Sequence, residues 1–158
     1  MEHATRKHIK VNLADDPVFY KTMSEKLDSI IQSHWEDWDA ILEGAQWLHL
    51  SGITPASSRT AAEATLVAAQ KAKEASAQVS IDLNFRSKLW KWDSPKTPRE
   101  LAQETMRTIL PYVDLVIANE EDCHDVLGIQ AGHTDVQSGT LDVARYPDVA
   151  SQIVKQFP

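Results

Sequence analysis

Apolar positions from residue 47 onward follow two spacings, one typical of buried strands and one typical of helices. Short, mainly apolar runs occur at WLHLSG (47–52), VSIDLNF (79–85) and VDLVIAN (113–119). Between these runs lie an alanine-rich segment at 57–76 and a segment at 98–111 with a proline in its first turn, both with helical signals. This alternation predicts an α/β fold, a Rossmann-like parallel sheet of three strands with helices on both faces.

Helical spacing also occurs outside this core, at 19–31, 39–45, 119–128 and 142–157. Asp37 is a candidate cap for the short turn at 39–45. Asn119 is a favoured N-cap, and Gly128 is a favoured residue just beyond a helix C-terminus. Neither a repeat nor a low-complexity linker is visible, which favours a single domain.

Charge and composition exclude several classes of function. The chain has 158 residues and a net charge of −7, from 16 basic and 23 acidic residues. An acidic chain is a poor general binder of nucleic acid or anionic membranes. No apolar run approaches the ~20 residues of a membrane span, and the first residues lack the apolar segment of a signal peptide. With Cys123 as its single cysteine, the chain is expected in a soluble, reducing, cytoplasmic setting.

Polar side chains cluster at the end of the second predicted strand. Asp82, Asn84 and Arg86 alternate with apolar residues, which predicts a polar row on one face. The guanidinium of Arg86 suits phosphate or carboxylate oxygens, and ligands of open parallel sheets bind at the carboxyl ends of strands. The alternative is that Arg86 pairs with a nearby carboxylate and Asn84 caps a turn.

The other two predicted strand ends also carry candidates. Asn119-Glu120-Glu121-Asp122 suits a helix N-terminus, with an amide cap and acids that complement the helix dipole. The same carboxylates could organise Mg²⁺ near a nucleotide, and the two interpretations are compatible. Gly52 allows a close approach to a ligand or a tight turn; the alternative is a plain break before the next helix.

Other catalytic signatures are weak or missing. Cys123 and His124 are adjacent, and neighbours on a helix point in different directions, so a nucleophile–base pair is not expected. The six histidines have no metal-ligand spacing, and the chain has no P-loop motif.

Four stretches resemble the ribokinase-like (PfkB) carbohydrate kinases, and most closely the 2-keto-3-deoxygluconate kinase group. They are WLHLSGITPA (47–56), VSIDLNFRSKLWKW (79–92), VDLVIANEEDCHDVLGI (113–129) and TDVQSGTLD (134–142). The D-x-N-x-R-x-x-L-W string is fairly specific to that group. On this resemblance, residues 34–158 are the central part of such a kinase domain, an incomplete ribokinase-like fold, and residues 1–33 are a partly helical segment that does not match.

The resemblance implies ATP-dependent phosphorylation of a sugar acid, with Mg²⁺. It places Ile53 and Arg86 beside the sugar and Asp122 near the metal, with Asp122 standing where the family has a longer Glu. It places the nucleotide and its phosphates beside Asn84, Phe85, Arg86 and Asn119.

The family's G-A-G-D element, which supplies the catalytic base and the anion hole, is absent from the 158 residues. The chain is therefore expected to carry no catalytic residue and to be inactive alone, as a fragment of a kinase. The alternative is a non-catalytic α/β domain that binds a nucleotide, a sugar acid or a protein partner. Exposed sheet edges would also favour a homo-oligomer.

Overall fold

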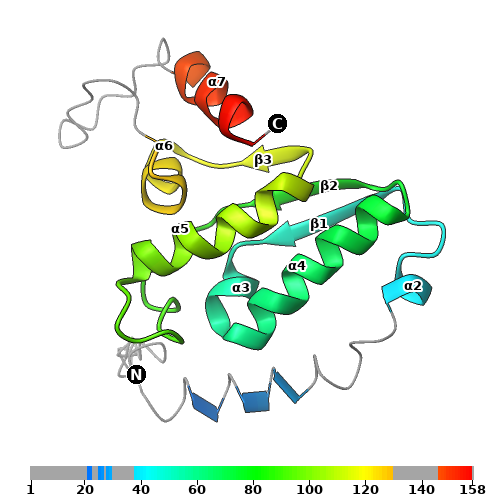
Figure 1. Cartoon of the computed structure of the whole chain (residues 1–158), viewed down its shortest axis with the longest axis horizontal. Coiled ribbons are helices and arrows are strands. Elements are labelled where there is room, and N and C mark those ends of the chain that lie inside the picture. The colour runs from blue at the N-terminus through cyan, green and yellow to red at the C-terminus, as the bar shows by residue number, and fades with distance from the viewer. Residues whose placement is uncertain (1–20, 23–24, 27, 30–37, 130–145, 158) are drawn as a thin grey trace, which may run out of the picture.

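A three-stranded parallel sheet forms the centre of the molecule (Figure 1). The computed structural model describes residues 21–22, 25–26, 28–29, 38–129 and 146–157. The strands β1 (Trp47–Ser51), β2 (Gln78–Asp82) and β3 (Leu115–Ile117) lie in the order β1-β2-β3. Leu50 lies opposite Ile81, and Ile81 lies opposite Val116. The predicted parallel α/β fold is confirmed.

Two long helices connect the strands, α4 (Arg59–Glu74) and α5 (Pro98–Ile109). The remaining described elements are the helices α2 (Trp38–Ile41), α3 (Ile53–Ser57), α6 (Glu120–Asp122) and α7 (Tyr146–Gln156), the 3₁₀ turn η2 (Leu110–Tyr112) and the π-helical turn η3 (Cys123–Leu127). The described residues among 19–31 are also helical. Within the described parts of the chain, no helix is long and apolar enough to cross a membrane.

Local sequence explains where the two long helices begin. The Ser58 hydroxyl accepts a hydrogen bond from the Ala61 N–H at 3.0 Å and caps α4. Thr97 and Glu100 form a reciprocal capping box at the start of α5, and Pro98 occupies the first turn. Alanines line the buried face of α4, and their small side chains let the helix lie close to the sheet.

The core lies between β2 and the two long helices. Val79, Ile81 and Leu83 are buried almost completely, as are Leu101 and Met106 of α5. Helix α4 contacts β1, β2 and α5, so α4 and α5 lie on the same face of the sheet (Figure 1). A β1-β2-β3 order with two right-handed crossovers places both helices on one side.

The opposite face of the sheet remains open within the described residues. Trp47 is 54% exposed, Leu115 46% and Ile117 48%. The Trp47 indole N–H donates to the Ser80 hydroxyl at 2.8 Å, and His49 Nδ1 lies 2.9 Å from the same oxygen. The two long helices cover one face of the sheet, as expected. Among the described residues, no long helix covers the other face.

Several boundaries differ from the sequence-based expectations. Strand β2 ends at Asp82 and not at residue 85, and helix α3 follows Gly52 directly, where the alternative interpretation has a plain break before the next helix. The predicted helix at 119–128 is split into α6 and the π-helical turn, and Gly128 ends it with a φ of 70°. Asp37 and the 134–142 stretch lie outside the described residues.

Candidate functional site

A hollow of about 1080 Å³ lies at the carboxyl ends of β2 and β3. It is lined by the loop after β2, the start of α5 and the segment after β3. Four of the predicted site residues line it together: Phe85, Arg86, Asn119 and Asp122. Asn84 and Ile53 do not line it. The tertiary structure thus joins two strand ends that are more than thirty positions apart in the sequence.

Asn84 turns the chain at the end of β2. Its φ is 40°, a left-handed conformation that Asn tolerates better than most residues. The predicted strand alternation through residue 86 is therefore wrong beyond Asp82, because the chain leaves the extended conformation at Asn84. This position fits the turn-forming alternative for Asn84.

Arg86 is exposed at the rim of the hollow. One Nη1–H donates to the Phe85 carbonyl at 2.8 Å. Within the described part of the chain, the guanidinium forms no ion pair, so the carboxylate-paired alternative for Arg86 has no support there. A guanidinium has several N–H donors, and Arg86 therefore keeps donors for an anionic ligand.

Asn119 and Asp122 form a small hydrogen-bonded unit after β3. The Asn119 side-chain oxygen accepts the Asp122 N–H at 2.7 Å, which is the predicted N-cap. Asp122 Oδ1 accepts the Phe85 N–H at 3.0 Å and thereby links the two strand ends. Sequence reasoning missed this link, because no local pattern shows which backbone amide a carboxylate will reach.

The described residues offer a metal ion few ligands of their own. They contain no group of three or more His, Cys, Asp or Glu side chains that could hold a metal. Asp122 uses one carboxylate oxygen for Phe85, which leaves the second oxygen for a cation. Mg²⁺ bound by one or two carboxylates together with substrate phosphates fits this donor set, whereas an all-protein metal centre does not.

Gly52 lies against the end of β2. The Gly52 N–H donates to the Asp82 carbonyl at 2.8 Å, and a Cβ on Gly52 would lie 2.0 Å from the Leu83 carbonyl oxygen. The glycine therefore permits a close approach between two chain segments, not between the backbone and a ligand. Ile53 begins α3 and is 37% exposed.

Two tryptophans fasten the loop that follows Arg86. Trp90 is 1% exposed, and the Trp92 indole N–H donates to the Pro55 carbonyl at 3.0 Å. The Arg59 guanidinium lies over the Trp92 ring, 5.0 Å from its centroid. The loop is thus tied to α3 and to the start of α4.

Ion pairs hold the far end of the same loop. Asp93 lies 3.4 Å from Arg59 and 2.8 Å from Lys96, and Lys96 lies 2.6 Å from Glu104 on α5. The hydrogen bond from Lys96 lowers the pKa of Asp93. These exposed pairs add little stability individually, but they restrict where the loop can lie.

Both signs of charge surround the hollow. Its basic residues are Arg86, Lys88 and Arg99, and its acidic residues are Glu121, Asp122 and Asp125. Arg99 Nε lies 2.9 Å from a carboxylate oxygen of the buried Asp125. The N-terminus of α5, whose helix dipole favours anions, also borders the hollow. A ligand that combines an anionic group with a bound cation suits this arrangement, because the basic residues can contact the anion and the acidic residues the cation.

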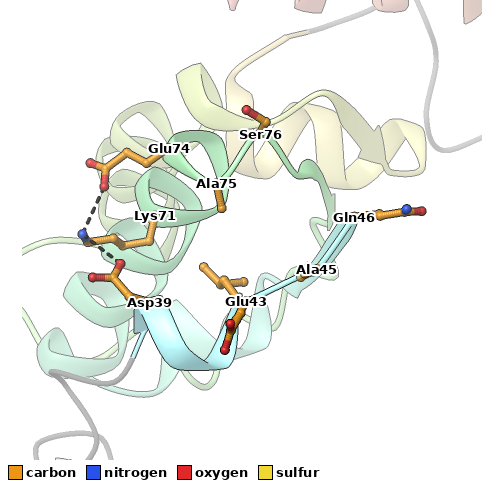
Figure 2. A pocket seen from close by; sticks show the side chains of 10 residues that line it. Asp39, Glu43, Ala45, Gln46, Lys71, Glu74, Ala75 and Ser76 are labelled. Atoms are coloured by element: carbon orange, nitrogen blue, oxygen red, sulfur yellow. Dashed lines mark ion pairs between the residues drawn. The ribbon is translucent and has the colours of Figure 1, made fainter.

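A second hollow, of about 520 Å³, lies at the opposite, amino ends of β1 and β2 (Figure 2). Lys71 of α4 lies 3.2 Å from Asp39 of α2 and 3.1 Å from Glu74. These carboxylates, Glu74 first, raise the pKa of Lys71. The ion pairs fasten α2 to α4, and none of the predicted site residues lies there.

Cys123 is buried behind the Asn119 cap and has no disulfide partner. Burial, with the charges of Asp122 and Glu120, raises its pKa to about 11. A thiol with such a pKa stays protonated near neutral pH, so Cys123 is a poor nucleophile.

Comparison with known proteins adds the family. The sequence pattern of the pfkB family carbohydrate kinases matches residues 9–147. A 2-dehydro-3-deoxygalactonokinase from Haloferax volcanii is 41% identical over 87 residues, which are 55% of this chain and 25% of that protein. The family match begins at residue 9, inside the segment 1–33. The domain boundary after residue 33 stays a prediction.

Solved structures show the same relationship. A 2-dehydro-3-deoxygluconokinase from Thermotoga maritima has a TM-score of 0.63 and 36% identity, over 77% of this chain and 33% of that one. A PfkB family carbohydrate kinase from Listeria grayi has a TM-score of 0.59 and 27% identity, over 77% and 32%. The chain thus spans a quarter to a third of the length of these relatives. On the extent of the family match, the chain belongs to the pfkB family of carbohydrate kinases.

Proposed function

We propose that this chain forms part of the binding wall of an ATP-dependent kinase for 2-keto-3-deoxygluconate or a related sugar acid. One observation carries the proposal: Arg86, Asn119 and Asp122 come from two strand ends and line one hollow. The names of two relatives, a 2-dehydro-3-deoxygluconokinase and a 2-dehydro-3-deoxygalactonokinase, support a 2-keto-3-deoxy sugar acid as the substrate class.

Each residue has a separate role in this proposal. Arg86 donates hydrogen bonds to the sugar-acid carboxylate and to the transferred phosphate, because its planar fork fits both kinds of oxygen pair. Ile53 contributes apolar wall on the sugar side. The phosphates of ATP lie against Phe85, Arg86 and Asn119, and Asn84 turns the chain that carries the first two.

Asp122 would hold Mg²⁺ through the carboxylate oxygen that Phe85 does not use. When bound, Mg²⁺ neutralises charge on the phosphates during phosphoryl transfer. The exposed Arg86 guanidinium, which lines the same hollow, would share that task.

We expect this chain to keep ligand binding and to lack catalysis. No G-A-G-D element occurs in the 158 residues, so no residue is assigned as the catalytic base. We expect the chain alone to bind ligands without transferring phosphate. Measurable phosphate transfer by the purified chain would contradict this expectation. Ligand binding without phosphate transfer is the result expected for a kinase fragment and also for the alternative, a non-catalytic domain.

The test is a thermal-shift titration of the purified chain with MgATP and 2-keto-3-deoxygluconate, separately and together. A ligand that binds only the folded state adds about 2.7 kcal/mol of stability at about a hundredfold excess over Kd. Arg86→Ala should weaken binding roughly tenfold or more, since it removes charge-assisted hydrogen bonds.

Arg107→Ala is the matched control, because Arg107 is also exposed and lies outside the hollow. It makes the same change in charge and should leave binding unchanged. The proposed site is wrong if the two arginine variants bind both ligands equally well.

Setting and assembly complete the proposal. A buried free cysteine suits a reducing, cytoplasmic setting, and a net charge of −7 argues against nucleic acid as a partner. β1 and β3 are the edge strands of the sheet within the described residues. Pairing through these edges would give a homo-oligomer, which sedimentation equilibrium can detect.

A further inference from the structure

The loop that carries Arg86 has little regular structure to shape it. Residues 83–97, between β2 and α5, contain neither helix nor strand. The Leu83 N–H still donates to the Ile117 carbonyl at 3.0 Å, but the chain then turns at Asn84. Beyond that point, backbone turns such as the Leu89 N–H to Arg86 carbonyl bond at 2.9 Å and hydrogen bonds from side chains take the place of the bonds of the sheet.

Asp122 supplies the first such bond. Its Oδ1 accepts the Phe85 N–H at 3.0 Å, across 37 positions of sequence, at a partly buried site. Asp122 is itself fixed, because the Asn119 side chain holds its backbone N–H at 2.7 Å. Arg86 follows Phe85 directly, and its guanidinium donates to the Phe85 carbonyl. The carboxylate and the guanidinium therefore contact the same residue from its two sides: Asp122 holds the Phe85 N–H, and Arg86 rests on the Phe85 carbonyl.

We propose that Asp122 is a positioning residue for Arg86: its carboxylate holds the Phe85 amide and so sets where the guanidinium meets an anion. This goes beyond a metal-holding role and rests on the proposed function, because it takes Arg86 as the anion-binding group. A carboxylate that only held a cation would not need its bond to Phe85. Positioning of this kind matters because small displacements of a binding group reduce its effect strongly.

Two substitutions separate positioning from charge. Asp122→Asn keeps a side-chain oxygen that can accept the Phe85 N–H, whereas Asp122→Ala does not. Both variants lose the same negative charge, so their general electrostatic effect on an anion is equal. Glu121 offers a matched pair, Glu121→Gln and Glu121→Ala, because it is exposed and lines the same hollow.

The experiment measures the Kd of inorganic tripolyphosphate by calorimetry in metal-free buffer, which removes any role in holding Mg²⁺. The Kd of Asp122→Ala should exceed that of Asp122→Asn roughly tenfold, the cost of leaving the Phe85 amide without its acceptor. The two Glu121 variants should agree within about twofold. Equal Kd values for the two Asp122 variants would overturn the proposal.

Hydrogen exchange of the Phe85 amide, measured by NMR, supplies a readout without any ligand. Exchange should be slow in the wild type and in Asp122→Asn, and at least about tenfold faster in Asp122→Ala. Unchanged exchange in Asp122→Ala would also overturn the proposal. If wild-type protein binds neither tripolyphosphate nor MgATP, the proposed function fails, while the exchange data still decide whether Asp122 fixes the turn.

Discussion

At the scale of single residues, backbone contacts explain side-chain choices that first suggest ligand binding. Gly52 is the clearest example. Its position between β1 and α3 suits a ligand-binding glycine, but its missing Cβ makes room for the Leu83 carbonyl. Asn84 similarly accommodates a left-handed turn. Both residues shape the candidate site without lining the hollow.

Gly52→Ala should destabilise the fold by about 1–3 kcal/mol, because the new Cβ would meet backbone and the strand ends would have to separate. Urea unfolding followed by circular dichroism measures the change.

Gly44→Ala is the matched control. Gly44 has a φ of 70° and nothing within 4 Å of an added Cβ, so its cost is about 1 kcal/mol of backbone strain alone. A smaller loss at Gly52 than at Gly44 would show that the two segments can separate freely.

At the scale of elements, capping residues decide where the helices next to the site begin. Helix α5 starts with a complete capping box, and its first turn borders the hollow. The Thr97 hydroxyl accepts from the Glu100 N–H at 3.3 Å, and the Glu100 carboxylate accepts from the Thr97 N–H at 2.9 Å. The Thr97 N–H and the Thr97 hydroxyl, which both donate to the Glu100 carboxylate, lower the pKa of Glu100. The ionised Glu100 carboxylate accepts these bonds, so the capping box contributes its full stability above the usual pKa of a glutamate and loses it as the pH falls below that value.

Thr97→Ala should cost about 1 kcal/mol of unfolding free energy, since one capping acceptor is lost. For a chain of this size the melting temperature should fall by about 2–4 °C. Differential scanning calorimetry near neutral pH measures both values.

Thr108→Ala in the same helix is the comparison, because Thr108 is exposed and caps nothing at the N-terminus. Its effect should stay within about 0.5 kcal/mol. Equal losses in the two variants would mean that the cap does not stabilise α5.

At the scale of the whole molecule, one face of the sheet is packed and the other is open within the described residues. The α4 and α5 helices bury the apolar side chains of β2, while Trp47, Leu115 and Ile117 stay about half exposed opposite them. Parallel sheets in α/β proteins are normally covered on both faces. The chain spans 33% of the Thermotoga maritima kinase, so this sheet is part of a larger architecture in that relative.

Buried groups also give the whole molecule a pH dependence. The pKa of Cys123 is raised from 9.0 to about 11 in the folded state, chiefly by burial. Its contribution to stability is therefore fully present below pH 9 and is lost as the pH rises toward 11. The loss should be on the order of 1 to 2 kcal/mol.

Urea unfolding of wild type and Cys123→Ala at pH 8 and pH 11 measures this contribution. The wild type should lose more stability than the variant over that interval. Lys71 and Lys96, whose pKa values are raised by their carboxylate partners, titrate in both proteins and cancel in the comparison. Parallel losses in the two proteins would show that Cys123 does not carry the effect.

Local sequence patterns were enough to predict the three strands, the two long helices between them and the family resemblance. Periodicity and caps are local properties, so the two long helices, the Asn119 cap and the end at Gly128 could be predicted. Phe85, Arg86, Asn119 and Asp122 could also be chosen as candidates, since their motif is contiguous within each strand end.

How these parts meet became visible in the folded molecule alone. The contact of Gly52 with the Leu83 carbonyl and the bond between Asp122 and Phe85 depend on segments far apart in the chain. The placement of both long helices on one face depends on strand order, which the local pattern does not contain. Non-local contacts fix these features, and that is the physical reason why the sequence pattern alone could not predict them.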